Sequence, residues 1–143
     1  MRTAREILAA KSKKPTTIGP DSTMLEALRL MAETDVGAAL VVQGGRLVGV
    51  VSERDFARKT ASQDLTVDAS VGEYMTTGAV AVPPDFTVAD CMALMLEKRV
   101  RHLPVLEGDT ILGVVSVRDV VKAVLDEKEY VIDQLVGYIS GRP

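Results

Sequence analysis

An internal repeat constrains the fold of this chain more than any other feature of its sequence. When the sequence is shifted by 64 residues, segment 18–55 aligns with segment 82–119 without a gap, and 15 of the 38 aligned pairs are identical. Further upstream, Glu6-Ile7-Leu8 aligns with Glu73-Tyr74-Met75 only if the first copy carries about three extra residues, which we place in the solvated stretch Lys11-Ser12-Lys13-Lys14. Chance would produce only a few such identities, so the 143 residues contain two copies of one structural unit.

Both copies predict the same order of elements, β-α-β-β-α. A short extended segment precedes a proline, which favours extension, and Thr23 or Thr87 then caps a helix whose apolar residues recur every three or four positions. Two apolar strands follow, joined by a glycine-containing turn, and a second helix begins where the last strand ends. The predicted strands lie at 16–18, 38–42 and 47–51 in the first copy and at 80–82, 103–106 and 111–115 in the second.

The size of the unit suggests how the copies are arranged. A unit of about 55–60 residues buries a core poorly by itself, so we expect an α/β fold in which the two copies pack sheet to sheet. We assign residues 1–64 to the first copy, 65–125 to the second and 126–143 to a C-terminal helical extension. The helical pattern that begins at Val117 continues to about Ser140, which exceeds what one copy needs. This helix either covers the chain's own core or forms a dimer contact.

The stretch Gly-Val-Val-Ser-x-Arg-Asp, at 49–55 and again at 113–119, is the most strongly repeated part of the chain. Its serine and aspartate, three residues apart at the start of a helix, are typical of a helix cap. The intervening arginine is a cation that a cap does not need, and the preceding glycine leaves room beside the strand. The hydroxyl and free helix N–H groups suit a phosphate or ribose, the arginine a phosphate, and the carboxylate two ribose hydroxyls. The stretch therefore predicts a ligand-binding corner in each copy.

Composition excludes several other functions. The net charge of −3, the pI near 5.2 and the 3% aromatic content argue against binding to nucleic acid or to an anionic membrane. No apolar run is long enough for a signal peptide or a membrane span, and a lone cysteine, Cys91, suits a reducing compartment, so we expect a cytoplasmic protein. His102 is the single histidine and lacks a cluster of cysteines or carboxylates around it, so we expect no metal site. No nucleophile–base pair emerges, so we expect no catalysis.

The doubled motif and the tandem repeat resemble a pair of CBS domains, also called a Bateman module, over nearly all of residues 1–125. The resemblance implies two β-α-β-β-α units packed through their sheets, with two clefts related by a pseudo-twofold axis. It also implies an adenosine-containing ligand, such as AMP, ATP or NAD(H), bound by a regulatory module that needs no cofactor. The alternatives are a ligand-free module that acts through dimerisation and protein partners, and an enzyme acting on nucleotides.

The resemblance also assigns roles to residues by their position in the motif. The two aspartates should hold ribose hydroxyls, the serines and arginines should lie on the ribose–phosphate side, and the remaining residues should line adenine pockets through backbone groups and apolar contacts. The residues assigned in this way are Thr17, Ile18, Gly37, Ala38, Ser52, Arg54, Asp55, Val82, Val100, Arg101, His102, Ser116, Arg118 and Asp119.

The two copies differ at one informative place. The second has Arg101-His102, a basic pair suited to a phosphate, where the first has Gly37-Ala38, so we expect two unequal clefts, one of them without a charged clamp. We also expect a homodimer, because the helices expose apolar surface that one pair of units may leave uncovered. The residues proposed for that surface are Leu25, Leu28, Phe56, Val120, Val124 and the long C-terminal helix.

Overall fold

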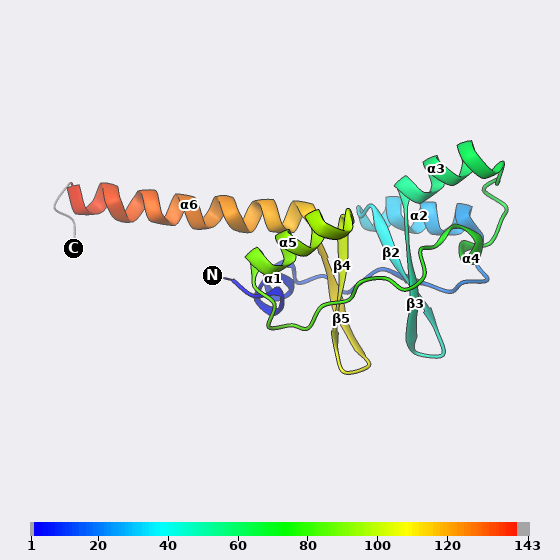
Figure 1. Cartoon of the computed structure of the whole chain (residues 1–143), viewed down its shortest axis with the longest axis horizontal. Coiled ribbons are helices and arrows are strands. Elements are labelled where there is room, and N and C mark those ends of the chain that lie inside the picture. The colour runs from blue at the N-terminus through cyan, green and yellow to red at the C-terminus, as the bar shows by residue number, and fades with distance from the viewer. Residues whose placement is uncertain (1, 140–143) are drawn as a thin grey trace.

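The structure, a computed structural model, describes residues 2–139 and has the predicted mixed α/β fold with two small sheets and a long C-terminal helix (Figure 1). Each copy contributes one sheet, one helix before its hairpin and one helix after it. In chain order, the elements are α1 (Ala4–Lys11), β1 (Thr17–Ile18), α2 (Met24–Thr34), β2 (Ala38–Gln43), β3 (Arg46–Ser52), α3 (Glu53–Gln63), α4 (Val71–Tyr74), α5 (Val88–Lys98), β4 (His102–Glu107), β5 (Thr110–Ser116) and α6 (Val117–Ile139).

The two sheets differ by one strand. In the first copy, β1 pairs in parallel with β2, and β2 pairs antiparallel with β3. In the second copy, β4 and β5 form the same antiparallel hairpin, but the predicted strand 80–82 is reduced to a single parallel bridge between Val82 and Val105. Proline explains the difference: Leu40 donates its N–H to the Thr16 carbonyl at 2.8 Å, whereas the counterpart of Leu40 is Pro104, which has no N–H to donate.

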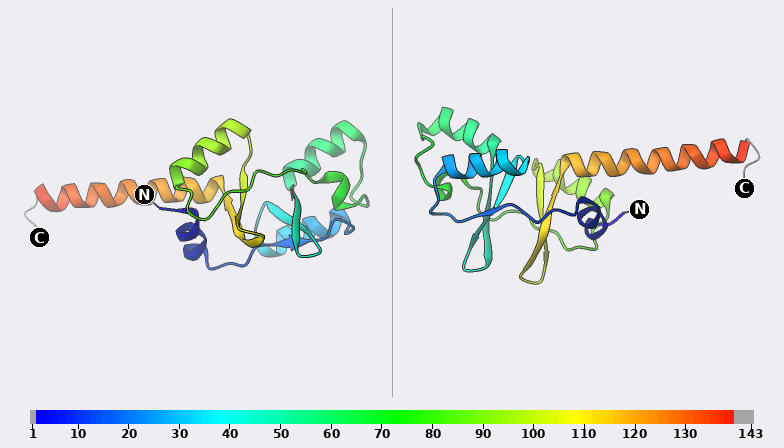
Figure 2. Two further views of the ribbon diagram at one scale, coloured as in Figure 1. Left: turned by 60° about the horizontal axis from the view of Figure 1, so that its bottom comes forward. Right: turned by 180° about the vertical axis from the view of Figure 1, so that it is seen from behind.

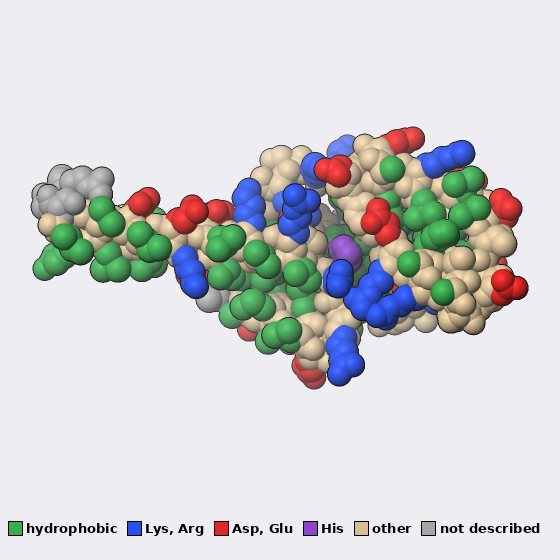
Figure 3. Space-filling view, turned by 90° about the horizontal axis from the view of Figure 1, so that it is seen from above, with side chains coloured by type: hydrophobic (Ala, Val, Ile, Leu, Met, Phe, Trp, Pro, Cys, Tyr) green, Lys and Arg blue, Asp and Glu red, His purple; other side chains and the backbone are tan. Residues whose placement is uncertain are grey.

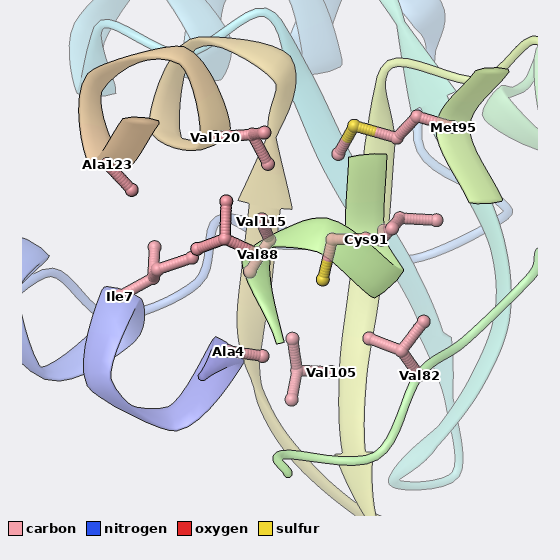
Figure 4. Close-up of a cluster of buried hydrophobic side chains, with 11 residues drawn as sticks. Ala4, Ile7, Val82, Val88, Cys91, Met95, Val105, Val115, Val120 and Ala123 are labelled. Atoms are coloured by element: carbon pink, nitrogen blue, oxygen red, sulfur yellow. The ribbon is translucent and has the colours of Figure 1, made fainter. Parts of the chain in front are cut away.

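The buried side chains form two cores, one in each copy, and each core contains the N-terminal helix of the other copy. Ala4 and Ile7 of α1 belong to the first copy in sequence, but they are buried in the core of the second copy, beside Val88 and Val105 (Figure 4). Val71 and Tyr74 of α4 belong to the second copy, but they are buried in the core of the first. The exchange of these two helices ties the copies together.

Matching backbone hydrogen bonds hold the two exchanged helices. The Ala4 N–H donates to the Phe86 carbonyl at 2.7 Å, and the Val71 N–H donates to the Ser22 carbonyl at 2.7 Å. Phe86 and Ser22 are aligned positions of the repeat, so the exchange follows the pseudo-twofold symmetry.

A glycine in each returning strand allows the exchanged segment to approach closely. A Cβ built on Gly49 would lie 2.8 Å from the backbone oxygen of Thr76 and 2.9 Å from the sulfur of Met75. A Cβ on Gly113 would lie 2.8 Å from a terminal carbon of Leu8 in α1. Leu8 and Met75 are aligned residues, so the two glycines admit equivalent neighbours.

The last helix is the longest element and leaves the body of the molecule. Its early residues Val120 and Ala123 are buried in the second core, whereas its C-terminal half projects away from the rest of the chain (Figures 1 and 2). The prediction that Val120 supplies exposed dimerisation surface is therefore wrong, because this side chain is 2% exposed. Among residues 2–139, α6 and the other helices are too short or too polar to cross a bilayer.

Candidate functional site

A cleft of about 760 Å³ opens where the two copies meet. Its walls come from three parts of the chain: the start of α6 with its motif residues, the segment Val36-Gly37-Ala38 before β2, and the end of α1 with the connection that follows it. Figure 3 looks onto this region and shows the chain's histidine side chain in a hollow between the two halves, with lysine and arginine side chains around it.

The motif of the second copy caps α6 on one wall of the cleft. The Ser116 N–H donates to Asp119 Oδ2 at 2.8 Å, and the Asp119 N–H donates to Ser116 Oγ at 3.2 Å. These reciprocal bonds confirm the predicted capping role. They also fix the Asp119 carboxylate, whose side chain is 16% exposed, at the cleft wall.

A lysine that the motif does not contain reaches the same carboxylate. Lys11, the last residue of α1, donates from Nζ to Asp119 Oδ2 at 2.9 Å and to the Val114 carbonyl at 3.0 Å. The exchange of α1 onto the second copy is what carries Lys11 there. Within the described residues, the hydrogen bonds to the Asp119 side chain all use Oδ2, which leaves Oδ1 as an acceptor for a ligand hydroxyl.

His102 lies at the first position of β4, where it pairs in register with Ser116. Burial lowers the pKa of His102; the charges of Lys11 and Arg101 act in the same direction, while Asp119 and Asp55 oppose it. The imidazole is therefore neutral near pH 7, and it offers one donor and one acceptor to the cleft instead of a charge.

The charge of the cleft wall is opposite to that of the whole chain. Its lining includes five lysines and arginines but two carboxylates, a formal balance of +3 with His102 neutral, in a chain whose formal charge is −3. Such a wall attracts an anion. The charged lining residues are Lys11, Lys13, Lys14, Arg101, Arg118, Asp35 and Asp119.

The motif of the first copy has the same local geometry, but its Ser52 and Asp55 do not line the cleft at Asp119. The Ser52 N–H donates to Asp55 Oδ2 at 2.9 Å, and the Asp55 N–H donates to Ser52 Oγ at 3.1 Å, so this pair also caps its helix. Arg54 lines a shallower depression of about 350 Å³ with Arg99 and Arg101. Nearby positive charges, chiefly that of Arg58 and then that of Arg101, lower the pKa of the exposed Arg54 guanidinium.

The structure brings together half of the residues assigned from the sequence. Gly37, Ala38, Arg101, His102, Ser116, Arg118 and Asp119 line the cleft, and Arg54 and Val100 line the depression, where Arg101 also contributes. The other assigned residues lie outside both hollows: Val82 in the second core, Ile18 against the first core, and Thr17, Ser52 and Asp55 elsewhere.

One expectation about the clefts is wrong. Gly37-Ala38 and Arg101-His102 were predicted to line different clefts, but both segments line the same one. Each segment leads into the first strand of a hairpin, and a hydrogen bond ties it to the start of the helix after that hairpin. The Glu53 N–H donates to the Gly37 carbonyl at 3.1 Å, and the Val117 N–H donates to the Arg101 carbonyl at 2.9 Å. The two hairpins stand beside each other (Figure 1), so the two strand entrances meet at the shared cleft.

Sequence reasoning missed the lysines of the cleft. Lys11, Lys13 and Lys14 were placed on a solvated connection, and they line the cleft because that connection crosses from the second copy to the first. The signal available in the sequence was the mismatch of about three residues between the copies. Across the part of the chain that the structure describes, no group of three or more histidine, cysteine, aspartate or glutamate residues could hold a metal ion.

Comparison with known proteins identifies the family. The model of the CBS domain matches residues 4–62 and 71–126. The mitochondrial CBS domain-containing protein CBSX3 of Arabidopsis thaliana is 36% identical over 127 residues, which cover 85% of this chain and 62% of that protein. This chain thus spans a little under two thirds of CBSX3.

Solved structures of CBS-domain proteins have the same fold as this chain. A putative signal-transduction protein with CBS domains from Burkholderia ambifaria is 40% identical, with a TM-score of 0.81, and the match covers 87% of this chain and 94% of that one. The CBS domain protein PAE2072 of Pyrobaculum aerophilum, solved in complex with AMP, is 26% identical, with a TM-score of 0.73 and coverage of 82% and 88%. The chain therefore belongs to the CBS-domain family and carries two CBS domains.

Proposed function

We propose that this chain is a regulatory module that senses an adenine nucleotide, AMP, ATP or NAD(H), and catalyses no reaction itself. The observation that carries the proposal is the cleft at Asp119, where a fixed carboxylate, a helix start and several cations line one hollow. A relative with the same fold, PAE2072, has been solved in complex with AMP. The cytoplasmic location stays a prediction from the sequence.

Each wall of the cleft suits one part of such a ligand. Asp119 Oδ1 accepts from ribose hydroxyls, as acidic residues do in other nucleotide sites. Arg118 and Arg101 pair with phosphate oxygens through charge-assisted hydrogen bonds. The small residues Gly37 and Ala38 leave room for the flat base beside backbone groups.

The pair between Lys11 and Asp119 supplies a route from binding to a response. Lys11 ends α1, so a ligand that engages Asp119 or Lys11 acts directly on a helix exchanged between the copies. A change in the position of α1 alters how the two copies pack. A sensor needs a coupling of this kind between its ligand and a bistable packing arrangement.

The alternative is a module that binds no ligand and acts only through protein partners. The cap bonds of Ser116 and Asp119 are compatible with that alternative, because capping alone explains those two residues. It does not explain why the cleft wall carries a balance of +3 in an acidic chain.

The deciding experiment is mass spectrometry of ligands released from the purified protein, followed by calorimetry with AMP, ATP and NADH. Asp119→Asn should weaken binding by about 1.5–3 kcal/mol, because a charged acceptor is lost. Asp55→Asn is the matched control, since it removes the same charge from an equivalent helix cap outside the cleft. If no adenosine ligand copurifies or binds, the proposal is wrong and the ligand-free module is favoured.

We also propose that the chain forms a homodimer through α6. An apolar stripe along α6 follows a heptad spacing, and Lys128 occupies one position in it. A single polar residue at such a position sets the register of self-associating helices. In a parallel pair, Lys128 lies beside Glu129 of the second copy, so the stripe complements itself. Its apolar members, each more than half exposed, are Val121, Leu125, Ile132, Leu135 and Ile139.

Light scattering tests this assembly. The wild type should exceed the 15.3 kDa of one chain, and Leu125→Glu with Ile132→Glu should return it to that mass. The matched control is Tyr130→Glu with Gln134→Glu, which adds the same charges beside the stripe and should leave the dimer intact. A wild type of 15.3 kDa at high micromolar concentration would contradict the dimer.

A further inference from the structure

The lysine-bearing connection between α1 and β1 is held at both ends, one on each copy. At its start, Leu8 of α1 packs on Gly113 of the second copy, and the Ser12 N–H ends the helix by donating to the Leu8 carbonyl at 3.3 Å. At its end, the Thr16 hydroxyl bonds to Thr34 at 3.1 Å in the first copy. The residues between these anchors therefore run along the cleft.

The lysines on this connection exceed what a single phosphate needs. Arg101 and Arg118 already provide two cations at the cleft wall, and a monophosphate carries about two negative charges. Lys11 is paired with Asp119, whereas Lys13 and Lys14 form no ion pair with any carboxylate in the described chain. Two further cations are thus free to meet additional negative charge.

The symmetry-related connection shows that these lysines are not a general requirement of the fold. The segment 75–80 takes the equivalent course between α4 and the second copy, and it contains no charged residue. When the sequences of α1 and α4 are aligned, Gly78 of this segment corresponds to Lys11. The positive charge therefore belongs to one cleft and not to the repeat.

We infer that this cleft selects a nucleoside di- or triphosphate over a monophosphate, a dinucleotide or an uncharged nucleoside, with Lys13 and Lys14 holding the terminal phosphates. The adenosine part of the ligand rests on the proposed function, but the charge selection does not. Each phosphate added to the chain brings negative charge toward the two free lysines, where Coulomb attraction is only partly screened at physiological salt. A ligand with a cationic sulfonium group in that place is repelled.

Calorimetry separates the attraction between the lysines and the terminal phosphates from the binding of the adenosine part. It should be done at about 0.1 M salt, where screening acts over roughly 10 Å. The wild type should bind ATP roughly tenfold more tightly than AMP or NADH, one charge-assisted contact being worth about that factor. Lys13→Ala with Lys14→Ala should remove this advantage and leave adenosine binding unchanged. The matched control, Arg29→Ala with Arg46→Ala, changes the net charge equally at exposed positions outside the cleft and should keep the advantage.

The outcomes distinguish this inference from the proposed function. Equal affinity of the wild type for AMP and ATP, or equal losses in the lysine variant and its control, would overturn the charge selection and leave nucleotide binding intact. Inorganic tripolyphosphate serves as a probe without a base. If it binds the wild type but not the lysine variant while no adenosine compound binds, the lysine site stands and the proposed function fails. If tripolyphosphate also fails to bind, both are wrong.

Discussion

The two copies carry the same motif, yet Ser116 and Asp119 of the second copy line the cleft of about 760 Å³ and Ser52 and Asp55 of the first do not. Ser116 and Asp119 bond to each other as Ser52 and Asp55 do, with distances that agree within about 0.1 Å. The difference lies in the chain that arrives from the other copy: Lys11 and its connection reach Asp119, whereas the uncharged segment 75–80 passes the first motif. The motif is a helix cap in both places, and its neighbours decide whether it lines the cleft.

The largest expected effect comes from the glycines that admit these neighbours. Gly49→Ala should lower the free energy of unfolding by about 3 kcal/mol and Gly113→Ala by about 2 kcal/mol. A new Cβ at 49 meets the backbone oxygen of Thr76, which a hydrogen bond to Val50 holds in place. A new Cβ at 113 meets the end of the flexible Leu8 side chain, which can move aside, so the loss there comes mainly from the φ of 159°, which residues with a side chain rarely adopt.

Urea denaturation of both variants measures this difference. Gly45→Ala is not a suitable control, because Gly45 has a positive φ of 77°. Gly19→Ala is suitable, because a Cβ there meets no atom within 4 Å, and it should change stability little. A loss at Gly113 as large as the loss at Gly49 would contradict the prediction, because it would mean that Leu8 cannot move aside or that the φ of Gly113 costs more than expected.

Much of this comparison could be predicted from the sequence, because the repeat itself was visible. The α-β-β-α order of each copy, the long helix and the capping bonds of both motifs follow from local patterns and were confirmed, whereas α1, α4 and the loss of the strand at 80–82 were not predicted. The exchange of α1 and α4 could not be predicted, because periodicity identifies an apolar face but not the core that the face covers. The cleft lysines were missed for the same reason, since their place depends on where α1 packs.

Other misses have local causes. The strand predicted at 80–82 shrinks to one bridge because Pro104 removes the donor that its counterpart Leu40 supplies. The separation of Gly37-Ala38 from Arg101-His102 failed because the sequence does not show that the entrances of β2 and β4 meet.

Arg101 tests whether the cleft binds through its phosphate side. Arg101→Ala should weaken AMP by about tenfold, the loss of one charge-assisted hydrogen bond, and should weaken adenosine much less. The matched control is Arg99→Asn, because Arg99 lines the shallow depression but not the cleft, and asparagine tolerates its positive φ of 55°. Titrations with both ligands decide it, and equal losses for AMP and adenosine would place Arg101 in the base pocket or in the fold.

Among residues 2–139, the ion pair between Lys11 and Asp119 has no counterpart in the first copy, so it offers a smaller test of the same asymmetry. A double-mutant cycle with Lys11→Met and Asp119→Asn should give a coupling of about 0.5–1 kcal/mol, since both side chains keep some solvent contact. Urea denaturation of the four proteins measures it. The pair Lys11→Met and Asp55→Asn should show no coupling, and a similar value there would mean that the effect is not local.

The smallest effect concerns pH, and it too belongs to the second copy, where His102 stands in place of Ala38. Burial lowers the pKa of His102 in the folded chain. In the unfolded chain the pKa of a histidine is about 6.5, so around and below that pH the folded state binds fewer protons than the unfolded state. The contribution to stability is therefore complete above that pH and declines as the pH falls below it. Urea denaturation from pH 8 to 5.5 should show this decline in the wild type and a flatter profile in His102→Gln. Parallel profiles for the two proteins would mean that His102 is as easily protonated in the cleft as in the unfolded chain, so that burial does not lower its pKa.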